Sequence, residues 1–229
     1  MPREVEIEER MKPYFIAMFT VTSLFAGAAM GDIYYDAEGD IATGNSNLDI
    51  TQVEVTTNGW DLSISITVAD LNADWGNYLI FMDYDPANGA PENNNPWGRD
   101  IGGYAGFDSF TGGWLNDGGG YQQWAFAGDN WYQQYETQPT IDWASSTITF
   151  NYMDLAYSLG SQGVDTIGFE VATTGGDWGN PAIDLLGGEG TQPGWGGGST
   201  ITDLQYFTIP APSALALLMM AGIGRRRRS

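Results

Sequence analysis

Three tryptophans and one arginine have the types and positions expected of a ligand-binding site. Trp97, Arg99 and Trp178 lie in stretches rich in Gly, Asn and Pro, and Trp114 follows two glycines. An aromatic ring offers a flat apolar face to a sugar ring, and an arginine can clamp the carboxylate of an acidic sugar. These residues therefore predict a carbohydrate site in which nearby amides and carboxylates bind the hydroxyl groups.

The same side chains also have a purely structural interpretation. Tryptophans in β proteins are often partly buried by packing, and this role stays open for Trp97 and Trp178. Trp124 lies inside an aromatic-rich stretch and is expected in the core. Arg99 is the only basic residue between positions 31 and 210. We therefore expect its guanidinium to pair internally with one of three carboxylates, Asp83, Asp85 or Asp100.

Five aspartates form two groups that could bind calcium. Asp83 and Asp85 follow an apolar run at positions i and i+2, so they point to the same side, and Asp100 follows in the same loop. Asp177 and Asp184 bracket a second loop. Calcium prefers oxygen ligands of this kind, although neither group has the EF-hand spacing. The alternative is that these residues are solvated and form turns.

The lack of cysteine and histidine and the strong negative charge of the sequence exclude several functions. With no cysteine and no histidine, the chain lacks thiolate zinc sites, the usual haem ligand and the Ser-His-Asp triad. Two carboxylates beside an aromatic cleft could serve a glycosidase, but the pattern does not pair a buried acid with a second carboxylate. The formal net charge of -21 repels nucleic acid and anionic membranes. We expect no enzyme, no zinc, no haem and no nucleic-acid partner.

The beginning of the chain is typical of a secretory signal peptide. After Met11, Lys12 supplies a positive charge, residues 14–25 are mostly apolar, and residues 26–29 are small. The acidic stretch before Met11 is unlike the start of a signal peptide. We therefore interpret residues 1–31 as an N-terminal extension and signal peptide that starts at Met11. The alternative is a membrane anchor, for which the apolar run is shorter than the roughly 20 residues that a span needs.

The end of the chain, residues 210–229, combines Pro210-Ala211-Pro212, a mostly apolar run as far as Gly224 and four arginines at 225–228. This order of proline motif, apolar helix and arginine cluster resembles the PEP-CTERM sorting signal of bacterial surface proteins, although that family usually has Pro-Glu-Pro. The resemblance implies export, processing by an exosortase-like membrane transpeptidase, and delivery to the cell envelope or extracellular matrix of a bacterium. Contact with the membrane would then be transient, through the terminal segments.

Between these ends, residues 32–209 have a β pattern throughout and form one predicted domain. Alternating apolar residues and short aromatic-rich runs are separated by Gly, Asn and Asp turns. The predicted strands are 32–36, 48–56, 60–69, 78–84, 104–110, 121–127, 130–136, 147–152, 165–173 and 200–209.

Shorter features connect these strands. A type I′ turn is expected at Asn58-Gly59, and a bulge near Thr51-Gln52 because the apolar phase changes there. One or two helical turns are expected at 153–159, and a surface loop at 187–198. The fold class is therefore all-β: an antiparallel β-sandwich or jelly roll, with short apolar helices in the two terminal targeting segments.

Two segments carry a second resemblance. Residues 48–55 with their hairpin, followed by the strand at 78–85, resemble DOMON-like and family 9 carbohydrate-binding-module domains. Short motifs at 95–99, 112–114 and 175–184 are similar to secreted bacterial members of that group. The resemblance implies a β-sandwich that binds sugar, sometimes with structural calcium, and does not imply catalysis.

These features predict a secreted, envelope- or matrix-sorted protein that binds a polysaccharide or glycan and is not an enzyme. We place the site on the loops around 83–99, joined by the loop at 175–184 if the fold brings them together. The alternative is a structural extracellular-matrix or cell-surface protein with no small-molecule ligand. Exposed aromatic rings beside polar side chains would favour the first function, and burial of every tryptophan would favour the second.

Overall fold

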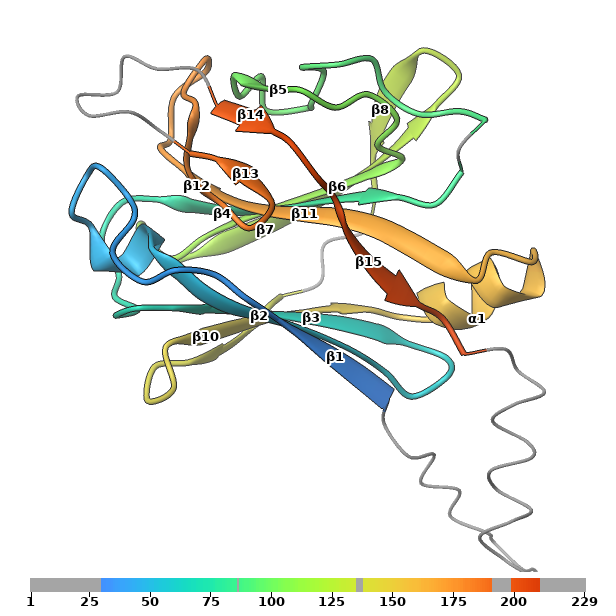
Figure 1. The fold of residues 1–229 in the computed structure, drawn as a ribbon, viewed down its shortest axis with the longest axis horizontal. Helices are drawn as coiled ribbons and strands as arrows, with labels where there is room; N and C mark the ends of the chain where they lie inside the picture. The colour runs from blue at the N-terminus through green and yellow to red at the C-terminus, as the bar shows by residue number, and fades with distance from the viewer. Residues whose placement is uncertain (1–29, 86, 135–137, 191–198, 211–229) are drawn as a thin grey trace, which may run out of the picture.

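In a computed structural model of the protein, two antiparallel β-sheets face each other across a hydrophobic core (Figure 1). The structure describes residues 30–85, 87–134, 138–190 and 199–210. The predicted signal peptide and sorting signal lie outside the described residues, apart from Met30, Gly31 and Pro210 at their inner ends. No helix in the described ranges is long and apolar enough to cross a membrane. Over the described residues the fold is all-β with one short α-helix, which is compatible with a β-sandwich.

The first sheet has five strands in the order β1-β2-β3-β10-β9. Their bounds are β1 Met30–Tyr35, β2 Ile50–Thr57, β3 Leu62–Val68, β9 Thr140–Asp142 and β10 Thr147–Tyr152. Strict alternation of buried and half-buried residues in β3 confirms the predicted inward and outward faces. The register of β2 on β3 shifts between Ile50 and Gln52, which confirms the predicted bulge.

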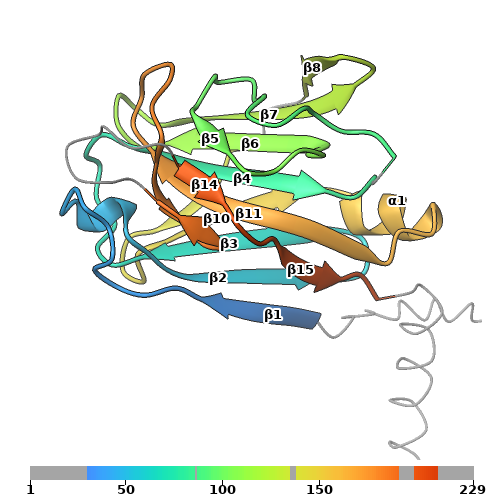
Figure 2. The ribbon, with the colours of Figure 1, turned by 45° about the horizontal axis from the view of Figure 1, so that its top comes forward.

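The second sheet follows the order β12-β11-β4-β6-β7-β8, and β15 pairs with the first part of β11. Its strands are β4 Asn77–Asp83, β6 Ser109–Trp114, β7 Gly120–Ala127, β8 Asn130–Gln133, β11 Thr166–Thr174, β12 Ala182–Leu185 and β15 Gln205–Thr208. A third, small sheet in the order β13-β14-β5 lies over its outer face (Figure 2). The strands of this small sheet are β5 Ile101–Gly102, β13 Gly188–Glu189 and β14 Ser199–Ile201.

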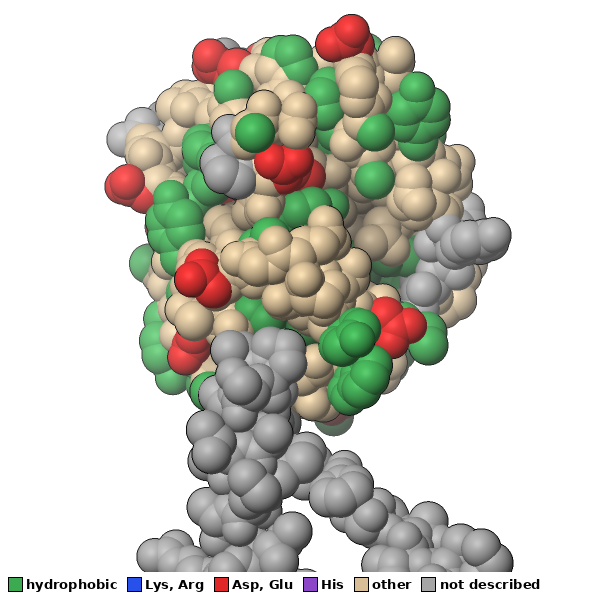
Figure 3. Space-filling model, turned by 90° about the vertical axis from the view of Figure 1, so that its right-hand side faces the viewer, with side chains coloured by type: hydrophobic (Ala, Val, Ile, Leu, Met, Phe, Trp, Pro, Cys, Tyr) green, Lys and Arg blue, Asp and Glu red, His purple; other side chains and the backbone are tan. Residues whose placement is uncertain are grey.

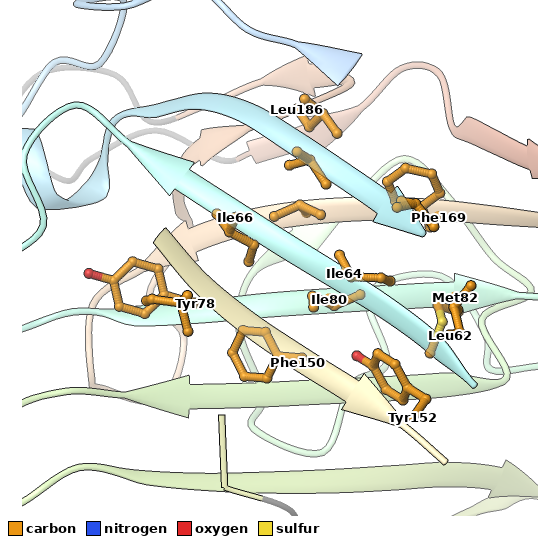
Figure 4. Packing of buried hydrophobic residues seen from close by; sticks show 14 of the residues in the cluster. Leu62, Ile64, Ile66, Tyr78, Ile80, Met82, Phe150, Tyr152, Phe169 and Leu186 are labelled. Carbon is orange, nitrogen blue, oxygen red and sulfur yellow. The ribbon is translucent and has the colours of Figure 1, made fainter. Parts of the chain in front are cut away.

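The central strands of the second sheet, β4 and β11, are buried on both faces. On its inner face Ile80, Met82 and Phe169 meet Ile64 and Phe150 of the first sheet (Figure 4). The outer face carries a second apolar cluster, which includes Leu79, Phe81, Phe107, Phe110 and Ala172. This double burial explains why β4 is apolar in both phases, as the sequence predicted. The loop between β4 and β6 crosses the outer face and holds the first group of predicted site residues.

The connections include one short helix and one short 3₁₀ turn. Helix α1 (Leu155–Ser161) confirms the helical expectation and buries Ala156 and Leu159 against the main core. The 3₁₀ turn η1 (Ser46–Leu48) precedes β2.

The predicted type I′ turn is wrong, because pairing ends at Thr57 with Leu62 and leaves four residues in the loop. Gly59 has a positive φ but Asn58 does not. The side chain of Asn58 instead accepts the N–H groups of Trp60 and Asp61, at 2.8 Å each.

Two predicted strands differ from the structure by more than a shift of their end residues. Residues 104–108 are not a strand, because Tyr104 and Phe107 turn onto the outer apolar cluster and strand pairing resumes only at Ser109. The expected single strand at 200–209 is divided into β14 and β15, since the chain crosses from the small sheet to the edge of β11. In the loop expected at 187–198, residues 188–189 form β13, and 191–198 lie outside the described part of the chain.

Candidate functional site

The four residues predicted to bind a ligand line one depression on the outer side of the second sheet. Its volume is about 380 Å³, and it is shallow and open to solvent. The lining residues are Asn77, Trp97, Arg99, Trp114, Gln122, Gly176 and Trp178. The fold thus brings together the β4–β6 loop and the loop at 175–181, which are almost 80 residues apart at their Arg99–Asp177 contact.

Strand register places the floor of the depression. Asn77 at the start of β4 is paired with Trp114 at the end of β6, and Gly112 is paired with Gln122 of β7. Because side chains alternate along a strand, Gly112 and Trp114 share the outer face, while Gly113 faces Phe150 in the main core. The glycine at 112 therefore leaves a gap in the outer face of a sheet that is otherwise covered by side chains.

Each of the three tryptophans lies against a glycine. A Cβ atom added at Gly112 would overlap the ring of Trp97, and one added at Gly98 would overlap the ring of Trp178. Trp114 lies over Gly120 in the same way. The glycines thus allow indole rings to approach the backbone closely, which a residue with a side chain would prevent.

Trp97 packs against neighbouring aromatic rings and also borders the depression. It is half-buried, and its ring packs edge-on against Phe110 and at a tilt against Trp114, with centroid distances of 5.3 and 5.9 Å. Its indole N–H donates to Oε1 of Gln122 at 2.8 Å. Trp97 is therefore part of the outer apolar cluster and also forms a wall of the depression. Trp124, expected in the core, packs against the same cluster while staying half-buried.

Trp178 has a different environment, because 79 % of its surface is exposed. It sits at the tip of the loop before β12, which is attached to the β4–β6 loop by main-chain hydrogen bonds. The N–H of Gly179 donates to the carbonyl of Gly98 at 2.8 Å, and that of Asp100 donates to the carbonyl of Asn180 at 2.9 Å. The exposed ring is thus held on an ordered loop.

Arg99 lies buried between the β4–β6 loop and the loop at 175–181 and holds them together. Its side chain is 5 % exposed, and its guanidinium donates to the carbonyls of Trp97, Gly176 and Asp177 at 2.8–3.0 Å. These carbonyls replace the carboxylate partners that the sequence suggested. Burial lowers the pKa of the guanidinium, an effect that the nearby Asp177 opposes. Arg99 therefore positions the loops.

No three of the expected calcium ligands cluster among the described residues. Asp83 accepts a hydrogen bond from Tyr104, while Asp85 accepts one from Asn88 and Asp100 one from Asn93. Among the described residues, one set of three carboxylates has oxygens within 4.8 Å of one another: Asp40, Asp49 and Asp184. Of the five predicted ligands, only Asp184 belongs to that set.

Three residues of this region were not predicted from the sequence. Asn77 and Gln122 line the depression, but Asn77 precedes the predicted strand at 78–84 and Gln122 is one polar residue in an aromatic-rich strand, so neither stood out in the sequence. Trp75 lines a second depression of about 440 Å³, which shares Gly176 with the first. The alternation of Gln122 with Trp124 on one face was the signal that could have placed Gln122 beside aromatic rings.

The charge of the described surface has one sign. Arg99 is the only basic residue in the described ranges, and it is buried. In the view of Figure 3, acidic side chains are scattered over the face and no basic side chain is visible.

No protein-family model matches the chain, and no curated protein matches it significantly.

Proposed function

We propose that this protein binds carbohydrate at the depression formed by Trp97, Trp114 and Trp178, and does not transform it. The observation that carries the proposal is the exposed indole of Trp178, held on an ordered loop beside two other tryptophans and two side-chain amides. Exposed rings beside polar groups are the arrangement that favours a glycan ligand over a purely structural role. We further propose that the fold is of the DOMON-like or family 9 carbohydrate-binding-module type.

The amides give the proposed site its directional hydrogen bonds. Oε1 of Gln122 accepts from the indoles of Trp97 and Trp124, so its amide nitrogen remains available to donate to a hydroxyl. The amide nitrogen of Asn77 donates to the carbonyl of Gly175 at 2.8 Å, which leaves its oxygen to accept. A donor and an acceptor beside apolar ring faces match a sugar, whose ring faces are apolar and whose edges carry hydroxyls.

The lining of the depression supports binding without catalysis. Glycosidases use two carboxyl groups on either side of the scissile bond. The described residues that line this depression include no carboxylate, and the one charged side chain among them, Arg99, is bonded to main-chain carbonyls.

A glycan array tests this function directly. The parent protein should bind a subset of polysaccharides, and Trp178→Ala should lose that binding while keeping the parental melting temperature. Trp143→Ala is the matched control, because Trp143 is also exposed, at 51 %, but lies between β9 and β10 of the other sheet. Absence of glycan binding by the parent would favour the structural matrix protein instead, and full binding by Trp178→Ala would overturn the placement of the site at Trp178.

A further inference from the structure

The loop between β1 and β2 gathers carboxylates at one end of the two sheets. Asp36 and Asp40 belong to this loop, Asp49 lies just before β2, and Asp184 comes from β12 of the second sheet. Figure 1 shows the loop beside β12. Oxygen atoms of Asp40, Asp49 and Asp184 lie within 4.8 Å of one another. Three ionised carboxylates at this spacing would repel strongly in a partly buried environment, so the cluster needs a proton or a cation to offset the repulsion.

Two oxygens of this group are buried without a hydrogen-bond partner in the described structure. Asp49 is 5 % exposed, and while its Oδ2 accepts the N–H of Gly39 at 2.8 Å, its Oδ1 accepts none. Asp36 likewise uses one oxygen on the N–H of Ala37 and has a buried Oδ2 without a partner. A buried carboxylate oxygen left in this way costs free energy unless another group compensates it.

The fourth carboxylate is fixed by the fold and directed at the loop. Asp184 is 4 % exposed, and its two oxygens accept the N–H groups of Ile50 at 2.6 Å and Leu185 at 2.9 Å. Burial together with the charges of Asp36 and Asp40 raises the pKa of Asp184 to about 8. The side chain therefore connects the second sheet to the start of β2 in the first.

From this geometry we propose that Asp36, Asp40, Asp49 and Asp184 form a calcium site that joins the β1–β2 loop to β12. All four ligands are carboxylates, which suit a hard cation. Two oxygens on opposite sides of a calcium ion lie roughly 4.6–5.2 Å apart, given bond lengths of 2.3–2.6 Å. The spacing of the three clustered carboxylates fits within that span. Calcium is favoured over magnesium because magnesium usually keeps several waters rather than entering a cage of protein ligands.

The proposed ion would act as a cross-link between the sheets. It would neutralise the repulsion of the four carboxylates and satisfy the buried oxygens of Asp36 and Asp49. Because β12 follows the loop that bears Trp178, the ion would also fix the end of that loop. The site itself is independent of whether the depression binds carbohydrate.

The test is calcium titration of metal-free protein by calorimetry, together with thermal melts in EDTA, calcium or magnesium at constant ionic strength. The parent should bind one calcium ion, melt at a higher temperature with it, and respond less to magnesium. Asp40→Asn is the informative variant because Asp40 is exposed, so its replacement should not prevent folding. Its affinity for calcium should fall at least about tenfold, since affinity follows the charge of the ligand set.

The same variant makes a prediction of opposite sign without metal. In EDTA, Asp40→Asn should melt at or above the parental temperature, because one of the repelling charges is gone; in calcium it should melt below it. Asp129→Asn, which removes an equal charge from an exposed turn, should keep the parental calcium response. An unchanged calcium affinity in Asp40→Asn, no calcium binding by the parent, or an equal response to magnesium would overturn the assignment.

Discussion

The indole of Trp178 lies against Gly98, so close that a Cβ atom at position 98 would overlap the ring. Gly98 also has a φ of 58°, which few residues other than glycine adopt, and its carbonyl accepts the N–H of Gly179. One glycine therefore supports the exposed ring and attaches its loop to the β4–β6 loop. The position of Trp178 is thus a consequence of backbone geometry on another loop.

Replacement of this glycine should change ligand binding more than stability. In Gly98→Ala, the new methyl group should displace Trp178, and the positive φ should cost about 1 kcal/mol of unfolding free energy. Gly128→Ala is the control, because Gly128 has a φ of 56° and no atom within 4 Å of an added Cβ. Both variants should show a similar loss in chemical denaturation, and only Gly98→Ala should lose affinity in glycan-binding assays. Equal binding by the two variants would argue against a role for the Trp178 position.

Trp97 should behave differently from Trp178, because it fills the gap above Gly112. We expect Trp97→Ala to lower the unfolding free energy by about 3 kcal/mol, a typical cost of removing a packed aromatic side chain. This differs from the expectation for an exposed contact residue, which would leave the melting temperature nearly unchanged. Denaturation curves of Trp97→Ala and Trp178→Ala measured side by side would check the contrast.

A second variant tests the same packing from the sheet. Gly112→Ala should expel the ring of Trp97 and cost about 1–3 kcal/mol by overpacking. Gly102→Ala is the control, because a Cβ atom there would meet no atom closer than 3.5 Å. If Gly112→Ala were as stable as Gly102→Ala, Trp97 could not be packed on that glycine.

Arg99 should matter for its shape rather than for its charge. Its three hydrogen bonds to carbonyls come from two nitrogens of one planar group, a geometry that a lysine ammonium cannot reproduce. Arg99→Lys should therefore lower the unfolding free energy by about 2 kcal/mol, which is in the range of a hydrogen bond to a charged group. Full stability of Arg99→Lys would show that the planar geometry of the guanidinium is not needed to hold the two loops together.

The features that could be predicted from the sequence are those in which apolar and polar residues alternate regularly, or change phase, within one strand. Alternation in β3 and β10 fixed their inward residues, and the phase change before Val53 located the bulge in β2. The β4 strand was apolar in both phases and is indeed covered on both faces. These properties depend on the sequence of a single strand, so they can be predicted without knowing which other segments pack against it.

Other features depend on contacts between distant segments. The prediction of a strand at 104–110 was wrong for its first five residues, because Tyr104 and Phe107 pack on the outer face of the second sheet. That face is formed by strands that are distant in the sequence. Pairing of Arg99 with carbonyls of residues 176 and 177 likewise requires two loops to meet. The carboxylates at 40, 49 and 184 are spread over three segments, so sequence spacing favoured Asp83 with Asp85 and left Asp40 and Asp49 unnoticed.

Processing of the chain ends is a separate prediction. If the terminal segments are a signal peptide and a sorting signal, protein from the native host should begin between Ala29 and Asp32 and lack the four arginines at 225–228. Intact-mass measurement of the native protein gives both ends at once. Retention of residues 1–10 or of the arginine tail would contradict this route to the cell surface.

The buried carboxyl of Asp108 should make stability depend on pH. Its Oδ2 accepts the N–H groups of Tyr84 and Asp85 at 2.8 and 2.7 Å, but burial, with the charges of Asp83 and Asp85, raises its pKa to about 6. The folded protein therefore holds this proton more tightly than the unfolded chain, whose aspartates have a pKa near 3.9. The resulting stabilisation is complete below about pH 4 and is lost as the pH rises through 6.

Asp108→Asn isolates this contribution, because the asparagine oxygen can still accept both N–H groups and carries no charge. A rise of the Asp108 pKa from about 4 to about 6 corresponds to at most about 3 kcal/mol of unfolding free energy. The difference in unfolding free energy between Asp108→Asn and the parent should therefore change in favour of the variant, by up to about that amount, between pH 4 and pH 7. Asp129→Asn removes an exposed charge and corrects for the overall negative potential. Urea denaturation at several pH values, in EDTA to exclude metal binding, measures all three proteins. A pH-independent difference for Asp108→Asn would mean that this carboxyl titrates alike in the folded and unfolded chains.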